Sequence, residues 1–445
     1  MEFSNLIFLF RFLPIFLLIY YLVPVRWKNP VLFFGSVIFY GLGNWQDTLL
    51  LAVSFLVNYL LTLIMTKKNG SPAWRRVWLV LLLVYDIGIL LFFKCFWDRL
   101  PLGISFYTFS MLSYVLDVYW KKVRVNRNPI ELGAYVWMFP KLISGPIAAY
   151  GDSIEAVHRH RIRPSQVEHG LSMMIVGLGF KVIIADHLGT LWKDVQTVGF
   201  ESISTPLAWI GMAGYCAQLF FDFQGYSLMA IGLGEMLGFT LPRNFKHPYR
   251  SKSVGEFYRR WHATLGEWFK KYIYIPLGGN RKGNLRTFLN LLVVWLITGL
   301  WHGVTWNFML WAMVLFLFIA LEKFVFKDKL SHMNWISHLY LLFVIPLTWM
   351  LFAITDIKQI GMYFSRLFPF FGTGVAVHAG DYLTYLKNYW LFFVLALLVS
   401  LPVADRFWKK CWNKWYTKIL LFAVFWVCVY LIAKGLKNPF MYFSF

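Results

Sequence analysis

The chain has 445 residues, of which 59% are apolar, 20% are aromatic and only 14% are charged. Ordinary soluble domains are roughly 45–50% apolar and about 25% charged, so this chain has too few polar side chains to cover a soluble globule. The aromatic content excludes a disordered chain, and four widely spaced cysteines exclude a disulfide scaffold. A soluble nucleic-acid-binding protein could have 43 Lys and Arg against 21 Asp and Glu, but it would not also carry many long apolar runs. A polytopic membrane protein remains, and the positions of its charges have to account for the net charge of +22.

Apolar runs of membrane-spanning length recur along the whole chain. A helix needs about 20 mostly apolar residues to cross a bilayer, and helices are expected because each one satisfies its own backbone hydrogen bonds. We therefore predict an all-α fold with roughly 10–12 transmembrane helices. The predicted spans cover residues 6–23, 31–42, 45–65, 77–93, 102–120, 170–188, 206–221, 288–300, 305–321, 336–354, 389–403 and 419–432.

Basic residues gather in alternate loops between these apolar runs. Because cytoplasmic loops carry an excess of Lys and Arg, this distribution predicts an N-terminus that lies outside the plasma membrane. The clusters are Arg26 and Lys28; Lys67, Lys68, Arg75 and Arg76; Lys121, Lys122, Arg124 and Arg127; Lys323, Lys327 and Lys329; and Arg406, Lys409, Lys410, Lys414 and Lys418.

The segment 134–149 breaks this alternation. It is apolar enough to cross, yet a crossing would place the basic residues of 158–163 outside. Pro140, Gly145 and Pro146 interrupt a helix here, and interrupted backbone is tolerated at membrane depth only where protein or a wet cavity surrounds it. We predict a re-entrant or broken segment, with an ordinary kinked span as the alternative.

Eleven Lys and Arg lie between residues 243 and 286, against two Glu. Within this basic block Ser253 and Glu256 have the spacing of a capping box, and apolar side chains follow at helical spacing. The block is predicted to be cytosolic and to hold an amphipathic helix in the membrane interface. His262 lies beside the aromatic stripe of this helix, where a histidine is more often a packing residue than a catalyst. The stripe consists of Phe257, Trp261, Leu265, Trp268 and Tyr272, and it is flanked by Arg259, Arg260, Lys270 and Lys271.

His302 lies between the apolar runs 288–300 and 305–321. An ionisable side chain is costly at membrane depth and is typical of a functional site, and a histidine can carry a proton near neutral pH. The alternative is a histidine that caps a short hairpin. No metal is predicted, because the spacings typical of metal sites do not occur. Four other ionisable residues at span edges are interpreted as interfacial, with contacts to the site residues as the alternative, namely Asp117, Asp186, His187 and Asp222.

Several motifs together resemble the membrane-bound O-acyltransferase (MBOAT) family, and in particular its alginate O-acetyltransferase AlgI-like bacterial branch. The resemblance runs from about residue 100 to the end of the chain, and it implies a ringed helical core around a tunnel. The motifs are 257–262 (FYRRWH), 272–281 (YIYIPLGGNR) and 299–303 (GLWHG), supported by 101–117, 139–147, 221–238, 244–249 and the tail 438–445.

The resemblance implies an acyl group taken from a cytosolic donor and passed to a hydroxyl group outside. His302 matches the near-invariant histidine of the family and is expected to act as general base. His262 matches the second histidine of the bacterial branch and is expected to orient the donor or to stabilise the oxyanion. Gly266 departs from the Ser or Thr that is common in this stretch. An anionic donor, acetyl-CoA or an acyl carrier protein thioester, is expected to be attracted by Arg259, Arg260, Lys270 and Lys271. The alternative for these four residues is retention of the block on the cytosolic side by contact with anionic lipid, and the two roles are compatible.

The implied acceptor is an extracytoplasmic polysaccharide or cell-wall glycan, reached with the help of an SGNH-type partner protein. No bound cofactor is expected, and membrane lipid is the other expected contact. Two alternatives stay open: D-alanyl transfer to teichoic acid from an acidic carrier protein, and a transporter or flippase. We predict N-terminal transmembrane helices at 1–99, a catalytic core at 100–325 that includes the block 243–286, and C-terminal transmembrane helices at 326–445.

Overall fold

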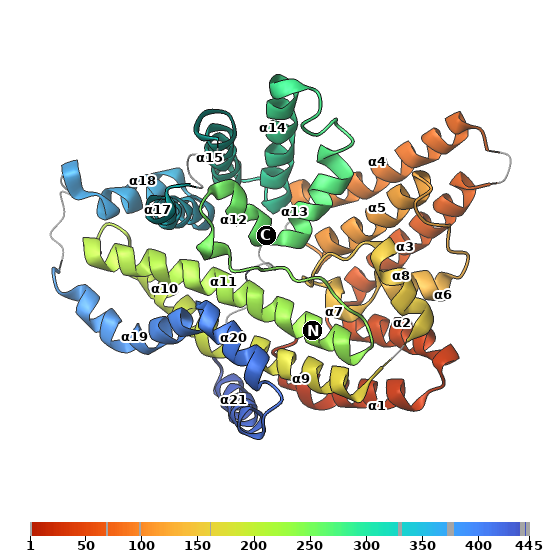
Figure 1. Cartoon of the computed structure of the whole chain (residues 1–445), viewed down its shortest axis with the longest axis horizontal. Coiled ribbons are helices and arrows are strands. Elements are labelled where there is room, and N and C mark those ends of the chain that lie inside the picture. The colour runs from red at the N-terminus through yellow and green to blue at the C-terminus, as the bar shows by residue number, and fades with distance from the viewer. Residues whose placement is uncertain are drawn as a thin grey trace. The chain divides into compact units, whose positions relative to one another are not determined.

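The computed structural model describes residues 2–67, 70–97, 99–160, 162–327, 332–371, 378–436 and 441. Within these ranges every regular element is a helix and no strand is present, which confirms the predicted all-α fold (Figure 1). Lys68 and Lys329 of the predicted basic clusters, Arg161 and most of the tail motif lie outside the described residues.

The chain divides into two compact units. Unit 1 is built from Met1–Leu178 and Tyr226–Arg243, and unit 2 from Gly179–Gly225 and Asn244–Met441. Helix α11, Thr205–Met236, contributes its N-terminal part to unit 2 and its last residues to unit 1. The functional division into 1–99, 100–325 and 326–445 stays a prediction.

Unit 1 is organised around α5, Ile104–Tyr119, in which every residue from Ile104 to Val118 is buried. Apart from Asp117 the side chains of α5 are uncharged, and a helix with so little charge is suited to such a position. Helices α3, α4, α6, α7 and α8 contact α5. The other elements of unit 1 are η1 Phe8–Phe12, α1 Leu13–Leu22, α2 Val25–Gly41, α3 Trp45–Met65, α4 Pro72–Phe96, α6 Pro129–Val136, α7 Phe139–Leu142, α8 Tyr150–Arg159 and α9 Pro164–Gly179.

The segment 134–149 is broken, as predicted. Helix α6 ends at Val136, and α7 covers only Phe139–Leu142, with a proline in its first turn. Lys141 is 3% exposed, and its ammonium lies 3.5 Å from the centroid of the Tyr135 ring and 3.2 Å from the Ser110 hydroxyl. The interrupted backbone is therefore buried by protein, whereas its depth in the membrane stays a prediction.

Unit 2 holds the basic block from Asn244 onwards and the two histidines of interest. Helices α14 and α15 form a hairpin, α15 packs on α17, and the short helix α12 packs on both α15 and α17. The elements are η2 Phe180–Ala185, α10 Asp186–Val198, the start of α11, η3 Pro248–Arg250, α12 Val254–Arg260, α13 Ala263–Phe269, η4 Lys270–Tyr274, α14 Gly283–His302, α15 Trp306–Leu321, η5 Glu322–Phe326, α17 Asn334–Ala353, α18 Ile357–Leu367, η6 Pro369–Phe371, α19 Asp381–Ser400, α20 Pro402–Cys411 and α21 Trp415–Ala433.

Eight helices in the described part of the chain are long and apolar enough to cross a membrane. They coincide with eight of the predicted spans, whereas the predicted spans 6–23, 31–42, 102–120 and 206–221 fall on other helices. The chain is therefore a multi-pass membrane protein, and a larger number of crossings stays a prediction. The eight helices are Trp45–Met65, Pro72–Phe96, Pro164–Val198, Gly283–His302, Trp306–Phe326, Trp335–Ala353, Asp381–Ser400 and Trp415–Ala433.

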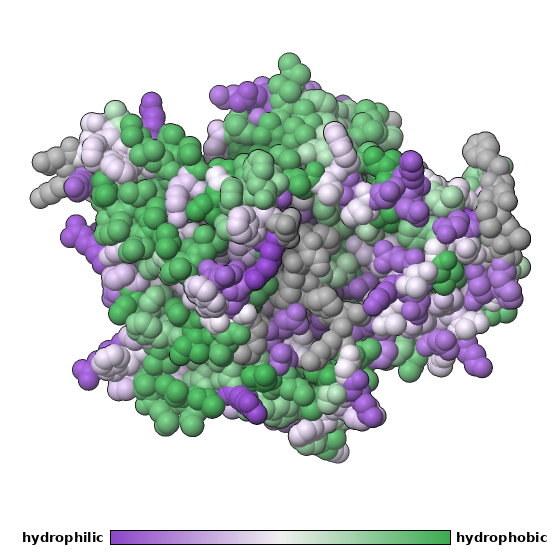
Figure 2. Space-filling model, turned by 180° about the vertical axis from the view of Figure 1, so that it is seen from behind, coloured by the Kyte–Doolittle hydropathy of each residue, from purple (hydrophilic) through white to green (hydrophobic). Residues whose placement is uncertain are grey.

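The surface is apolar where these helices face outwards. On α21 the side chains of Phe422, Trp426 and Tyr430 are 65%, 48% and 60% exposed. Figure 2 shows broad hydrophobic areas on one face of the molecule, with polar residues scattered among them. Large contiguous apolar areas are unusual on soluble monomers, and they fit a surface that lipid covers.

Candidate active site

The basic block 243–286 contains two short helices joined at a corner, whereas the sequence predicted one amphipathic helix. Helix α12 ends at Arg260, α13 begins at Ala263, and His262 between them has left-handed backbone angles, φ 44° and ψ 49°. The predicted cap is present, because the Ser253 hydroxyl accepts a hydrogen bond from the Glu256 N–H at 3.0 Å. The spacing of apolar residues shows which side chains share a face of a helix. A break of only two residues between two helices hardly changes that spacing, so the sequence predicted a single helix.

The aromatic stripe of the block packs inside unit 2. Phe257, Trp261 and Trp268 are 0%, 3% and 7% exposed. The ring centroid of Trp349 on α17 lies 4.9 Å from that of Trp261 and 6.3 Å from that of Phe257. The rings of the stripe thus contact other helices, since the same hydropathy pattern suits a helix that docks on protein, and the position of the block in the membrane interface stays a prediction.

His262 is 4% exposed, and its imidazole lies against Asn244. Asn244 Oδ1 lies 2.9 Å from His262 Nδ1, 2.8 Å from Thr264 Oγ1 and 3.4 Å from the main-chain nitrogen of Thr264. The Asn244 carbonyl also accepts a hydrogen bond from the Ala263 N–H at 2.8 Å. Burial lowers the pKa of His262 to about 3, so the imidazole is neutral near pH 7.

His302 is the last residue of α14 and is 6% exposed. Aromatic rings surround its imidazole, with centroids at 4.6 Å for Trp301, 5.0 Å for Trp311, 5.1 Å for Phe352 and 6.2 Å for Phe308. These rings come from α14, α15 and α17. His302 does precede a hairpin turn, but its side chain is packed among rigid rings, which restrict its orientation as a reacting group requires.

One indole links the two histidines. The ring centroid of Trp301 lies 6.0 Å from that of His262 and 4.6 Å from that of His302. Phe223 of α11 packs edge-on against the His262 ring at 4.7 Å. The two histidines predicted as catalytic therefore belong to one buried aromatic cluster, although α13 and most of α14 separate them in the sequence.

The sequence model of the membrane-bound O-acyltransferase family matches residues 37–353, which include both histidines. The chain belongs to this family. Its relatives include the probable alginate O-acetylase AlgI of Pseudomonas putida, 32% identical over the whole of both chains, and the peptidoglycan O-acetyltransferase of Helicobacter pylori, 33% identical over 70% of this chain and 68% of that protein. The teichoic acid D-alanyltransferase of Lacticaseibacillus rhamnosus is 28% identical over 53% of this chain and 62% of that protein.

The resemblance inferred from the motifs is thus confirmed, and the chain is an acyltransferase. The transporter or flippase alternative is withdrawn, because the family match covers most of the chain. The roles of His302 and His262 within this membrane-bound O-acyltransferase stay predictions.

The four basic residues expected to attract the donor lie near the corner in sequence, on α12 and η4. Arg260 is paired with Glu256 at 2.5 Å, Lys270 lies 3.9 Å from Glu267, and Lys271 lies 4.9 Å from the centroid of the Tyr272 ring. Arg259 and Lys270 are exposed, whereas Arg260 and Lys271 are half-buried. Exposed ion pairs contribute little to stability, so the pairing of Lys270 with Glu267 is a small obstacle to an anionic ligand.

A buried carboxylate that the sequence analysis did not single out holds the start of α12. Glu322, the first residue of η5, is 8% exposed. It accepts hydrogen bonds from the Val254 N–H at 2.6 Å, the Gly255 N–H at 2.9 Å and the Tyr340 hydroxyl at 3.1 Å. A negative charge is favourable at a helix N-terminus. Because α12 leads into the corner at His262, Glu322 helps to position the second histidine of this acyltransferase.

Replacing Glu322 with Ala is expected to lower the free energy of unfolding by about 1–3 kcal/mol, because buried donors at the start of α12 lose their acceptor. Glu322→Gln keeps one acceptor oxygen and is expected to lose less. Thermal unfolding of the detergent-purified protein measures both effects, with the exposed Glu155→Ala as control. Equal losses for all three variants would contradict this assignment.

Gly266 is the position that departs from the family pattern, and it lies on the exposed side of α13. A methyl group added there would meet only the Tyr258 carbonyl oxygen at 3.5 Å, an ordinary contact. Gly266→Ala is therefore expected to raise the free energy of unfolding by about 0.5–1 kcal/mol, because Ala loses less conformational freedom than Gly in a helix. In Gly232→Ala the methyl group would lie 2.3 Å from the Gly170 carbonyl oxygen, so this control should lose stability in the same thermal assay.

A buried ionic cluster lies elsewhere in unit 2. The Lys181 ammonium lies 2.7 Å from Asp186 and 2.8 Å from Asp222, and the three side chains are 3%, 4% and 2% exposed. The main-chain N–H of Met441 also donates to Asp222 at 2.8 Å. The interfacial interpretation of the two aspartates is thus wrong, because the Lys181 partner allows them to be buried. Charged residues inside the apolar run 170–188 were the available signal.

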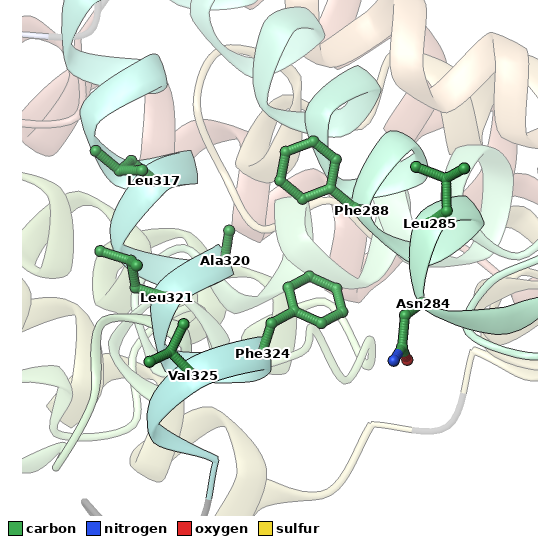
Figure 3. Close-up of a pocket in the computed structure, with 8 residues that line it drawn as sticks. All are labelled: Asn284, Leu285, Phe288, Leu317, Ala320, Leu321, Phe324 and Val325. Atoms are coloured by element: carbon green, nitrogen blue, oxygen red, sulfur yellow. The ribbon is translucent and has the colours of Figure 1, made fainter.

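A groove of about 360 Å³ lies between the start of α14 and the end of α15, away from the histidines in sequence. Figure 3 shows Phe288 and Leu285 of α14 across from Leu317, Ala320 and Phe324. Its walls are almost wholly apolar and lie on two helices that are able to cross a membrane. Of the residues that line the groove only Asn284 is polar, and none is a histidine, so the histidine cluster is the candidate active site.

Proposed function

We propose that this acyltransferase moves an acetyl group from a cytosolic thioester, acetyl-CoA, to hydroxyl groups of an extracytoplasmic polysaccharide or cell-wall glycan. The observation that carries the proposal is the pair of histidines on one buried aromatic cluster, in a chain similar over its whole length to an alginate O-acetylase. D-alanyl transfer has weaker support, because the D-alanyltransferase relative matches only 53% of this chain.

In the proposed reaction His302 is the general base. It takes the proton of the acceptor hydroxyl as the hydroxyl oxygen attacks the carbonyl carbon of the thioester. The carbon–sulfur bond then breaks, the proton passes to the leaving thiolate, and the products are an acetyl ester and a free thiol. General-base assistance of this kind contributes about 10²–10⁴-fold to a rate. The aromatic rings around His302 exclude water that would otherwise compete for the acetyl group.

The site is proposed to lie between two compartments. The positive-inside pattern supports a plasma-membrane protein with its N-terminus outside and its basic block in the cytosol. The donor then approaches from the basic side, and an SGNH-type partner protein receives or presents the acceptor on the outer side. An acyl carrier protein thioester is the second donor of the same chemical class.

Reconstituted vesicles test the proposal directly. The purified chain is supplied with radiolabelled acetyl-CoA on one side and an oligosaccharide with an SGNH-type acetyltransferase on the other. Alkali-labile label on the oligosaccharide is expected, and it should depend on His302. Transfer only from a D-alanyl carrier protein would contradict acetyl transfer.

Charge at the basic block is expected to assist donor capture. Arg259→Ala should raise the KM for acetyl-CoA several-fold at low ionic strength and much less at about 0.5 M salt, because salt screens exposed charges. Arg260 is already paired with Glu256, so Arg260→Ala should have the smaller effect. Steady-state kinetics measure both, with the exposed Lys409→Ala as control. A KM in Arg259→Ala that matches the control would remove the steering role.

A further inference from the structure

Asn244 is a buried asparagine, 1% exposed, beside the second histidine. Two main-chain hydrogen bonds hold its segment along the corner of the basic block: the Ala263 N–H donates to the Asn244 carbonyl at 2.8 Å, and the Lys246 N–H donates to the Arg260 carbonyl at 3.0 Å. These two bonds join the segment 244–246 to the residues on either side of His262, and so they hold the Asn244 side chain next to the imidazole.

The chemistry of the neighbours decides which end of the Asn244 amide faces His262. A main-chain N–H can only donate, and the Thr264 N–H points to the Asn244 side chain with 3.4 Å between nitrogen and oxygen. A reversed amide would set its NH₂ group against this donor. The atom is therefore the oxygen, and the Thr264 hydroxyl, at 2.8 Å, donates to it as well.

An amide oxygen is only an acceptor, so the nitrogen of His262 that lies 2.9 Å from it must carry the hydrogen. We infer that Asn244 is a positioning residue that holds His262 as the neutral tautomer protonated on Nδ1, so that His262 meets the substrate as a hydrogen-bond acceptor through Nε2. This inference rests on the proposed function and deepens it.

The tautomer distinguishes the two roles expected for His262. A neutral Nε2 has a lone pair and no hydrogen, so it cannot donate to an oxyanion. The rings that pack on the imidazole, Phe223 and Trp301, are apolar and favour its neutral form. His262 therefore orients the donor, by accepting a hydrogen bond from an N–H group. The amide N–H groups of the pantetheine arm of a CoA-type or carrier-protein thioester are donors of this kind.

Nitrogen-15 NMR of the histidine-labelled protein reads the tautomer. The signals of His262 are assigned by difference from His262→Asn, since Asn tolerates left-handed backbone angles. Hydrogen on Nδ1 at pH 7 is the expected result. Hydrogen on Nε2, or on both nitrogens, overturns the inference.

Binding of a thioether analogue of acetyl-CoA, which cannot react, tests the consequence. Asn244→Leu has similar size but accepts no hydrogen bond, and is expected to bind the analogue about tenfold more weakly, the effect of losing about 1.4 kcal/mol. Asn244→Asp keeps an acceptor oxygen and should restore binding of the analogue. Its negative charge raises the pKa of His262, so the fall of the transfer rate at acid pH should begin at a higher pH than in the wild type. A purely structural role would lower the unfolding temperature and leave analogue binding by the folded protein unchanged, which overturns the inference.

The inference and the proposed function fail in different ways. If the wild-type chain in the vesicle assay transfers no acetyl group from acetyl-CoA, the proposed function is wrong whichever tautomer is present. If both variants lose transfer while His262 carries its hydrogen on Nε2, the proposed function stands and the role of Asn244 is wrong.

Discussion

Replacing His302 with Ala is expected to lower the rate of acetyl transfer by about 10²–10⁴-fold, because the variant lacks the imidazole that takes the hydroxyl proton in the proposed reaction. The change should appear in kcat, since a base acts in the transition state and contributes little to binding of the donor. Transfer of label from acetyl-CoA by the reconstituted variant measures the loss.

The controls separate chemistry from folding. His302→Gln keeps most of the side-chain volume among the four aromatic rings, so it should fold normally and still lose the base. His378→Ala removes an exposed histidine and should transfer at the normal rate. Normal turnover by folded, membrane-inserted His302→Gln would rule out the base.

Lys181→Met is expected to cause the largest loss of stability, about 3–5 kcal/mol, because it leaves Asp186 and Asp222 buried without their cation. Two carboxylates at this depth repel each other and have lost their hydration. The expected readout is a lower unfolding temperature in detergent, with a smaller yield of folded protein.

Removing the charges together should restore stability. In the triple variant Lys181→Met, Asp186→Asn and Asp222→Asn no buried charge remains, so it should unfold at a higher temperature than Lys181→Met alone. Lys193→Met, at an exposed position on α10, is the matched control and should behave as the wild type. A triple variant no more stable than Lys181→Met would show that the cluster is not held by charge pairing.

Local sequence patterns predicted the features that depend on nearby residues. Hydropathy placed the eight apolar helices, since the length of an apolar run sets whether a helix can cross a bilayer. Two prolines and a glycine predicted the broken segment near Lys141, and the spacing of Ser253 and Glu256 predicted the cap of α12. The motifs around His262 and His302 also predicted the family that the comparisons confirmed.

Other features depend on residues that are far apart in the sequence. The corner at His262 was missed because a helical repeat does not show where two short helices meet. Glu322 was missed because its partners, at the start of α12, precede it by more than sixty residues. Lys181 was not singled out, and its partner Asp222 was misplaced, because a charged side chain near the end of an apolar run is equally compatible with an interface and with a buried pair.

Local patterns in the amino-acid sequence are enough to predict an all-α membrane protein, a positive charge concentrated in one block, and the family to which the motifs around His262 and His302 point. The contact of both histidines with the ring of Trp301, and that of Asn244 with His262, became visible only in the folded chain. The difference lies in how far apart in the sequence the contributing residues are. Hydropathy, capping and charge distribution are properties of neighbouring residues, whereas a hydrogen-bonded imidazole and a buried ion pair exist only after distant segments pack together.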